Sequence, residues 1–114
     1  HKVHLDDVNI IVKEQANNLH RLGYKIIIVT GRDGVCEDLT KEWLELHEIN
    51  YDLIYTRPKN DFRKDSAIKT EIYNNHIKDK YFVKAVFDDR LQVLKTWNEL
   101  GLFTFNVNQG NKEF

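Results

Sequence analysis

Residues 83–90 read Val-Lys-Ala-Val-Phe-Asp-Asp-Arg, an apolar run that ends in an acidic pair. A buried strand of a parallel sheet is a nearly continuous apolar run, and α/β sheets bind ligands beyond the carboxyl ends of such strands. The sequence therefore predicts a strand that delivers the carboxylates of Asp88 and Asp89 to the rim of a sheet.

A second stretch of the chain has the same pattern. Residues 26–29, all Ile or Val, lead into Thr30, Gly31 and Arg32. Because the carboxyl ends of parallel strands lie at one edge of a sheet, this strand would bring a hydroxyl, a glycine and a guanidinium to the same rim. Together the two strand ends could hold a divalent metal ion and a phosphate group. The nucleophile that phosphoryl chemistry also requires is missing from the sequence.

Hydrophobic periodicity predicts alternating helices and strands along the chain. A helix ahead of the first strand is unusual for a parallel α/β sheet with right-handed crossovers, and suggests that a strand is missing upstream. No repeat or interdomain linker is visible, so we expect one domain over residues 1–114, incomplete at its N-terminus. The expected helices cover residues 7–22, 39–47, 63–76 and 91–100. The expected strands cover residues 24–30, 52–56, 83–87 and 102–107, and a loop is expected over residues 31–38.

Composition narrows the class of protein. The chain has 114 residues, of which 41% are hydrophobic and 31% charged, a balance typical of a globular domain. Its net charge of −1 excludes a strongly basic nucleic-acid binder. A local basic patch stays possible at Arg57, Lys59, Arg63 and Lys64. One cysteine allows no internal disulfide, and no membrane span or signal peptide is visible, so we expect a cytoplasmic protein. The absence of methionine, even at position 1, suggests a fragment or a processed product.

The acidic pair has two interpretations. Mg²⁺ prefers hard oxygen ligands and takes one or two carboxylates with several waters, so Asp88 and Asp89 could hold it. A cation would also relieve the repulsion between two adjacent carboxylates. Alternatively, Asp89 simply caps the helix that follows, a position where aspartate is favoured.

The Thr30-Gly31-Arg32 segment also has two interpretations. A hydroxyl and backbone N–H groups around a glycine can hold phosphate oxygens, and Arg32 could grip a phosphate through two parallel hydrogen bonds. The alternative is an ordinary turn with a solvated arginine.

Lys69 lies one helical turn after Asp65 in the third expected helix. A lysine near a phosphate site stabilises the charge that the transition state redistributes. The alternative is an exposed i,i+4 ion pair, worth a few tenths of a kcal/mol. Other chemistries are poorly supported, since the five histidines and single cysteine lack zinc-ligand spacing and no P-loop pattern occurs.

The order of these signals resembles a known family. A hydroxyl after a strand, then a lysine, then an acidic pair after another strand resembles motifs II to IV of the haloacid dehalogenase (HAD) superfamily of phosphatases, whereas response-regulator receivers have a different order. The resemblance narrows to the 3′-phosphatase domain of phage-type polynucleotide kinase/phosphatases and covers nearly the whole chain. It is carried by residues 22–32, by 63–65 with 69–72 and 76–77, and by 85–93 with Trp97 and Gly101.

The resemblance implies a HAD-like Rossmannoid fold, a three-layer sandwich around a parallel sheet with no large cap. It implies a Mg²⁺-dependent phosphomonoesterase that removes 3′-phosphates from DNA or RNA ends through an aspartyl-phosphate intermediate. It further implies a phage- or virus-encoded repair protein in the host cytoplasm, with a kinase domain in the same polypeptide.

The resemblance also implies roles for individual residues. Thr30 and Arg32 would contact the phosphate or organise the site. Lys69 would stabilise the transferring phosphoryl group, and Asp65 would hold Lys69 or Arg32 in place. The implied Mg²⁺ ligands, direct or through water, are Asp88 and Asp89.

One departure from the family is large. The Asp-x-Asp-x-Thr sequence that carries the nucleophile at the end of the first, central strand is absent, as is the arginine that follows it. We therefore expect the nucleophile and the central strand to lie outside these residues or to come from a partner. Two alternatives stay open: a HAD phosphatase acting on nucleotides or other small phosphate esters, and a catalytically inactive HAD-like binding domain.

Overall fold

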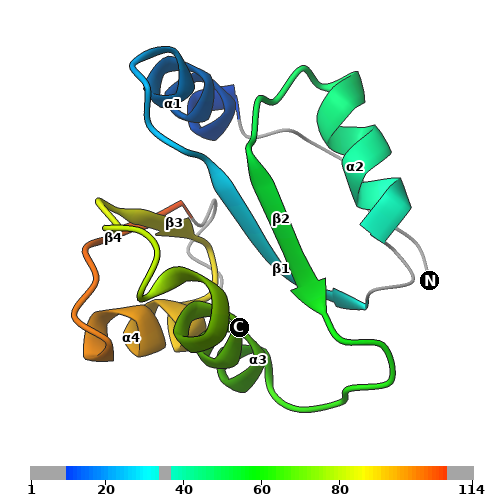
Figure 1. Cartoon of the computed structure of the whole chain (residues 1–114), viewed down its shortest axis with the longest axis vertical. Helices are drawn as coiled ribbons and strands as arrows, with labels where there is room; N and C mark the ends of the chain where they lie inside the picture. The colour runs from blue at the N-terminus through cyan, green and yellow to red at the C-terminus, as the bar shows by residue number, and fades with distance from the viewer. Residues whose placement is uncertain (1–9, 34–36, 108–114) are drawn as a thin grey trace. The chain divides into compact units, whose positions relative to one another are not determined.

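The computed structural model describes residues 10–33 and 37–107, and these residues fall into two compact units, one up to Phe62 and one from Arg63 onward. The first unit contains α1 (Ile10–Arg21), β1 (Ile27–Asp33), α2 (Glu37–Leu46) and β2 (Leu53–Arg57) (Figure 1). The second contains α3 (Asp65–Ile72), the π-helix η2 (Tyr73–Ile77), β3 (Val86–Asp88), α4 (Leu91–Glu99) and β4 (Thr104–Asn106).

The first unit is built around a pair of parallel strands. Ile27, Ile28 and Val29 of β1 lie in register with Leu53, Ile54 and Tyr55 of β2. The helix α1 ends before Gly23, whose φ of +95° is a conformation that a glycine adopts without strain. Gly23 therefore lets the chain turn from the end of α1 into β1.

Side chains tie the start of this strand pair together. Asn17 donates to the carbonyl of Glu48 at 3.0 Å and accepts from the backbone N–H of Asn50 at 2.9 Å. The carboxylate of Asp52 accepts from the N–H of Ile26 at 2.6 Å. These bonds fix the end of α1 and the start of β1 against the segment that leads into β2, and so help to set the register of the pair.

The carboxyl end of β1 contains a β-bulge. The register shifts between Val29, which faces Tyr55, and Asp33, which faces Arg57, so that residues 30–32 have no register partner on β2. Bulges are common next to functional sites, where they re-aim side chains. The Thr-Gly-Arg segment therefore lies in an irregular part of the strand.

The second unit packs α3 and η2 against α4. Its buried apolar side chains come from all three helices: Ile68, Ile72, Ile77, Val93, Leu94 and Trp97. Next to this core, β3 and β4 pair in parallel, and Phe87 stacks on its register partner Phe105 with ring centroids 4.9 Å apart. Burying these side chains is the main stabilising contribution to the unit.

The α/β class and the parallel pairing are confirmed, and several element limits differ from prediction. β1 continues to Asp33, where a loop from Gly31 was expected, because the bulge allows Asp33 to pair again with Arg57. The expected helix 63–76 begins at Asp65 and becomes a π-helix at Tyr73. The start of the helix expected from residue 7 lies outside the described residues.

Each sheet has two strands in the part of the chain that the structure describes, β1 with β2 and β3 with β4. The organisation as a single domain stays a prediction, and the two units are described separately. Among the described helices, none is long and apolar enough to cross a bilayer.

Candidate active site

The second unit holds a buried lysine between two carboxylates. Lys69, on α3, is 7% exposed, and its Nζ lies 3.1 Å from Asp88 Oδ2 and 3.5 Å from Asp65 Oδ2. Asp65 lies one turn earlier on α3, and Asp88 ends β3. Burial of a charge is costly unless it is paired, and these two carboxylates supply the partners that a buried ammonium needs. The alternative of an exposed i,i+4 pair is wrong, because Lys69 is buried and has a second carboxylate partner.

Asp65 links this lysine to a second cation. Its Oδ2 also accepts from Nη1 of Arg90 at 3.1 Å, and Arg90 is the N-cap residue of α4. Its other oxygen, Oδ1, is buried and accepts no hydrogen bond from the described residues. Asp65 thus binds two cations with one oxygen and keeps acceptor capacity on the other.

Asp88 has four hydrogen-bond donors. Its Oδ1 accepts from the backbone N–H groups of Asp89 at 2.8 Å and Arg90 at 3.2 Å. Its Oδ2 accepts from Lys69 Nζ and from Trp97 Nε1, both at 3.1 Å. A carboxylate offers about four lone-pair sites, so Asp88 is saturated and fixed in orientation.

Asp89 differs from its neighbour, because it is exposed at the end of β3. It is not the helix cap that one interpretation predicted, since the N-cap of α4 is Arg90 and no side chain caps that helix. The described residues contain no group of three or more potential metal ligands of the His, Cys, Asp and Glu types. Mg²⁺ is commonly bound through one or two carboxylates together with several waters, and the carboxylates of Asp88 and Asp89 are donors of that type. Asp89 is the more exposed of the two.

In the first unit, Thr30 and the backbone of Arg32 lie in the β1 bulge. The Arg57 side chain holds this bulge: its Nε donates to the carbonyl of Gly31 at 2.7 Å and its Nη1 to that of Asp61 at 3.0 Å. Because the carbonyl and N–H of a trans peptide point in opposite directions, the N–H of Arg32 points away from Arg57.

The structure therefore collects the predicted site residues in two groups. Asp65, Lys69 and Asp88 are in mutual contact in the second unit, with Asp89 adjacent in the chain. Thr30 and Arg32 share the bulge of the first unit. Their catalytic and metal-binding roles stay predictions. The sequence did not predict the hydrogen bonds of Arg57 and Trp97. Helical or strand spacing indicates which face of an element is buried, but not which acceptor a polar atom on that face will contact.

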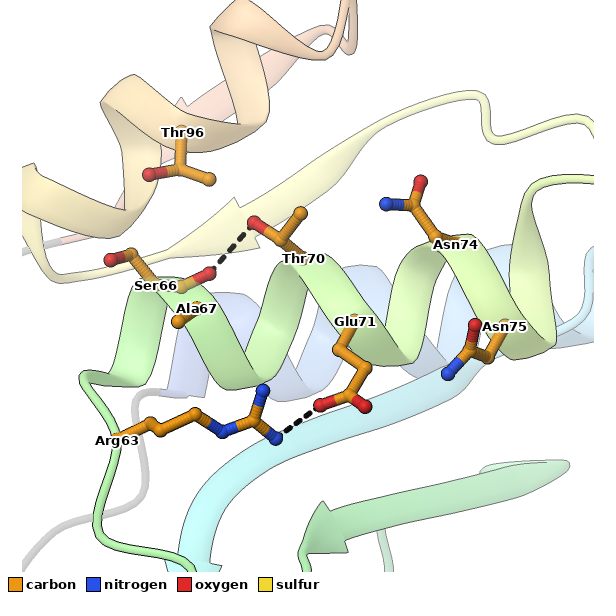
Figure 2. A pocket seen from close by; sticks show the side chains of 8 residues that line it. All are labelled: Arg63, Ser66, Ala67, Thr70, Glu71, Asn74, Asn75 and Thr96. Atoms are coloured by element: carbon orange, nitrogen blue, oxygen red, sulfur yellow. Dashed lines mark hydrogen bonds and ion pairs between the residues drawn. The ribbon is translucent and has the colours of Figure 1, made fainter.

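The second unit also has an open polar cavity of about 470 Å³ along α3 and η2 (Figure 2). Arg63, Glu71, Asn74 and Asn75 are among its lining residues, and Arg63 forms an ion pair with Glu71 across it. Neither Lys69 nor Asp88 lines the cavity. The guanidinium of Arg63 is thus paired within the chain, which weakens the case for a basic patch here.

Comparison with known proteins identifies the family. Residues 1–112 match the family model described as the polynucleotide kinase PNKP phosphatase domain. A putative bifunctional polynucleotide kinase/RNA ligase of Autographa californica nuclear polyhedrosis virus is 40% identical over 91 residues, covering 78% of this chain and 13% of the viral protein.

Solved structures agree. A chain of a Pnkp1/Rnl/Hen1 complex matches 95% of this chain at 38% identity with a TM-score of 0.88, and 38% of that chain is covered. A chain of the Pnkp1/Rnl/Hen1 RNA repair complex matches with a TM-score of 0.89 and 38% identity. The match covers 95% of the present chain and 35% of the chain in that complex. This chain thus spans well under half the length of each of these longer chains. The HAD-like fold is confirmed, and the chain belongs to the family of polynucleotide kinase PNKP phosphatase domains.

Proposed function

We propose that this chain is part of a Mg²⁺-dependent phosphomonoesterase that removes 3′-phosphates from polynucleotide ends. The observation that carries the proposal is the buried ammonium of Lys69, held by two carboxylates at 3.1 and 3.5 Å. An ammonium has three donors, and the described contacts direct it to only these two carboxylates, which leaves one donor for a phosphoryl oxygen. A cation fixed in this way stabilises developing charge without reorganisation during the reaction.

The other predicted site residues have roles of their own in the proposed mechanism. In the first unit, the hydroxyl of Thr30 and the N–H of Arg32, whose peptide is oriented by Arg57, are donors of the kind that phosphate oxygens accept. Asp88 and Asp89 would hold Mg²⁺, directly or through water. When bound, the ion neutralises charge on the phosphate. The nucleophile is an aspartate of an Asp-x-Asp-x-Thr sequence outside residues 1–114, and the second aspartate of that sequence protonates the leaving hydroxyl.

Short connections favour a polymer substrate. Residues 34–36 alone separate β1 from α2, and residues 58–64 alone separate β2 from α3, so neither connection holds a cap domain. An uncapped site is open to a polynucleotide end, whereas closed sites suit small molecules. The matched family and the similarity to a chain of the Pnkp1/Rnl/Hen1 RNA repair complex support the same substrate class.

The test is phosphate release by the full-length protein from 3′-phosphorylated DNA and RNA oligonucleotides in Mg²⁺. We expect release from 3′ ends, none from 5′-phosphorylated oligonucleotides, and none after chelation of the metal. Hydrolysis of small phosphate esters without activity on oligonucleotides would favour the small-ester alternative. No hydrolysis of any ester would favour the inactive binding domain.

A further inference from the structure

Trp97 connects the core of the second unit to the buried lysine. It lies on the buried face of α4 with Val93 and Leu94, is 3% exposed, and meets the ring of Tyr73 edge-on at 6.2 Å. From this apolar setting its Nε1 donates to Asp88 Oδ2 at 3.1 Å. A core residue thus bonds directly to the carboxylate that holds Lys69.

Two side-chain donors from two helices converge on that one oxygen. Lys69 reaches Oδ2 from α3 and Trp97 reaches it from α4, each at 3.1 Å. The indole is a rigid ring immobilised by packing, whereas a lysine is a flexible chain with rotatable donors. The ring therefore sets the position of Oδ2, and Oδ2 sets the position of the ammonium.

We propose that Trp97 is a positioning residue for phosphoryl transfer, acting through Asp88 on Lys69. This inference rests on the proposed function of Lys69 and adds a residue that does not touch the substrate. The plainer interpretation is that a buried indole N–H needs an acceptor and finds Asp88. The two interpretations differ in one consequence: only the first requires the N–H for the placement of Lys69.

The test separates the N–H group from the packing of the ring. In the full-length protein, Trp97→Phe removes the N–H and part of the ring, and replacement of Trp97 by β-(3-benzothienyl)alanine keeps the bicyclic shape but puts sulfur in place of the N–H. Val93→Ala is the matched control, since Val93 is 1% exposed on the same helix and makes no side-chain hydrogen bond. The readouts are Tm, kcat and KM on a 3′-phosphorylated oligonucleotide, and the ¹⁵Nζ resonance of Lys69.

We expect the benzothienyl variant to keep a Tm near that of the wild type, with kcat reduced about tenfold, KM unchanged and the Lys69 resonance shifted. Trp97→Phe should show the same loss of kcat with a lower Tm. Val93→Ala should lower Tm but leave kcat and the resonance unchanged.

The inference is overturned if the benzothienyl variant keeps the wild-type kcat and Lys69 resonance. A wild-type protein without phosphatase activity would refute the proposed function alone. In that case the Lys69 resonance of the benzothienyl variant still decides the point: a shift supports positioning by Trp97, and an unchanged resonance refutes it.

Discussion

The environment of Lys69 in the structure differs from the exposed ion pair that helical spacing alone would predict. On helical spacing alone it pairs with Asp65, yet it is 7% exposed and also contacts Asp88. Removal of one partner from a buried ion pair leaves an uncompensated charge, which is strongly destabilising.

The first prediction concerns the stability that this contact provides. Lys69→Met should lower the free energy of unfolding by about 3 kcal/mol, because two buried carboxylates lose a cation. Urea titration of the full-length protein measures this. Lys95→Met on the exposed side of α4 is the control and should change the free energy by less than about 0.5 kcal/mol. Equal losses in both variants would contradict the assigned role of the buried pair.

The second prediction separates the two adjacent aspartates. Asp89→Asn should raise the Mg²⁺ concentration needed for half-maximal activity and leave Tm nearly unchanged, because Asp89 is exposed. Asp88→Asn should lower both Tm and activity, because Asp88 has four protein donors. Metal titrations and thermal unfolding check the pair, and a large Tm loss in Asp89→Asn would reverse the assignment.

At the scale of elements, the side chain of Arg57 supports the bulge of β1. Arg57 donates to two backbone carbonyls, those of Gly31 and Asp61, from the fixed fork of its guanidinium. A lysine has no such fork and cannot hold both acceptors in the same geometry.

The third prediction follows from this clamp. Arg57→Lys should accelerate amide hydrogen exchange in residues 30–33, because the bulge loses its fixed support. Lys59→Gln, on the exposed loop that follows β2, is the control and should leave exchange unchanged. Unchanged exchange in Arg57→Lys would show that the bulge is stable without the clamp.

Sequence alone could predict most elements but not the bulge. The apolar runs 26–29 and 83–87 indicated the strands, whereas Trp97 stood out only as one of the residues that carry the family resemblance. Thr-Gly-Arg-Asp has the composition of a turn, so local propensity favoured a loop. Tertiary pairing of Asp33 with Arg57 overrode that preference.

At the scale of the whole molecule, the resemblance to a phosphatase depended on the order of the motifs along the chain, since no single motif was specific. Thr30, Lys69 and the pair at 88–89 each had a plain structural interpretation, and only their sequence along the chain resembled a phosphatase. The hydrogen bond from Trp97 could not be predicted, because it depends on how α4 packs beside β3. The family match then identified the chain as a member of the polynucleotide kinase PNKP phosphatase domains.

The fourth prediction concerns substrate size. Because the connections 34–36 and 58–64 are too short for a cap, the protein should prefer 3′-phosphorylated oligonucleotides to 3′-mononucleotides. We expect a preference of about tenfold in kcat/KM, which corresponds to about 1.4 kcal/mol of transition-state binding from neighbouring nucleotides. Steady-state kinetics on both substrates measures it, and equal values would contradict an open polymer site.

The central claim, that the buried Lys69 ammonium stabilises phosphoryl transfer, is tested most directly by phosphate release from a 3′-phosphorylated oligonucleotide in Mg²⁺. At a temperature where all three proteins are folded, we expect the wild-type protein and Lys95→Ala to release phosphate. Lys69→Ala should release none above background. Normal turnover by folded Lys69→Ala would contradict it.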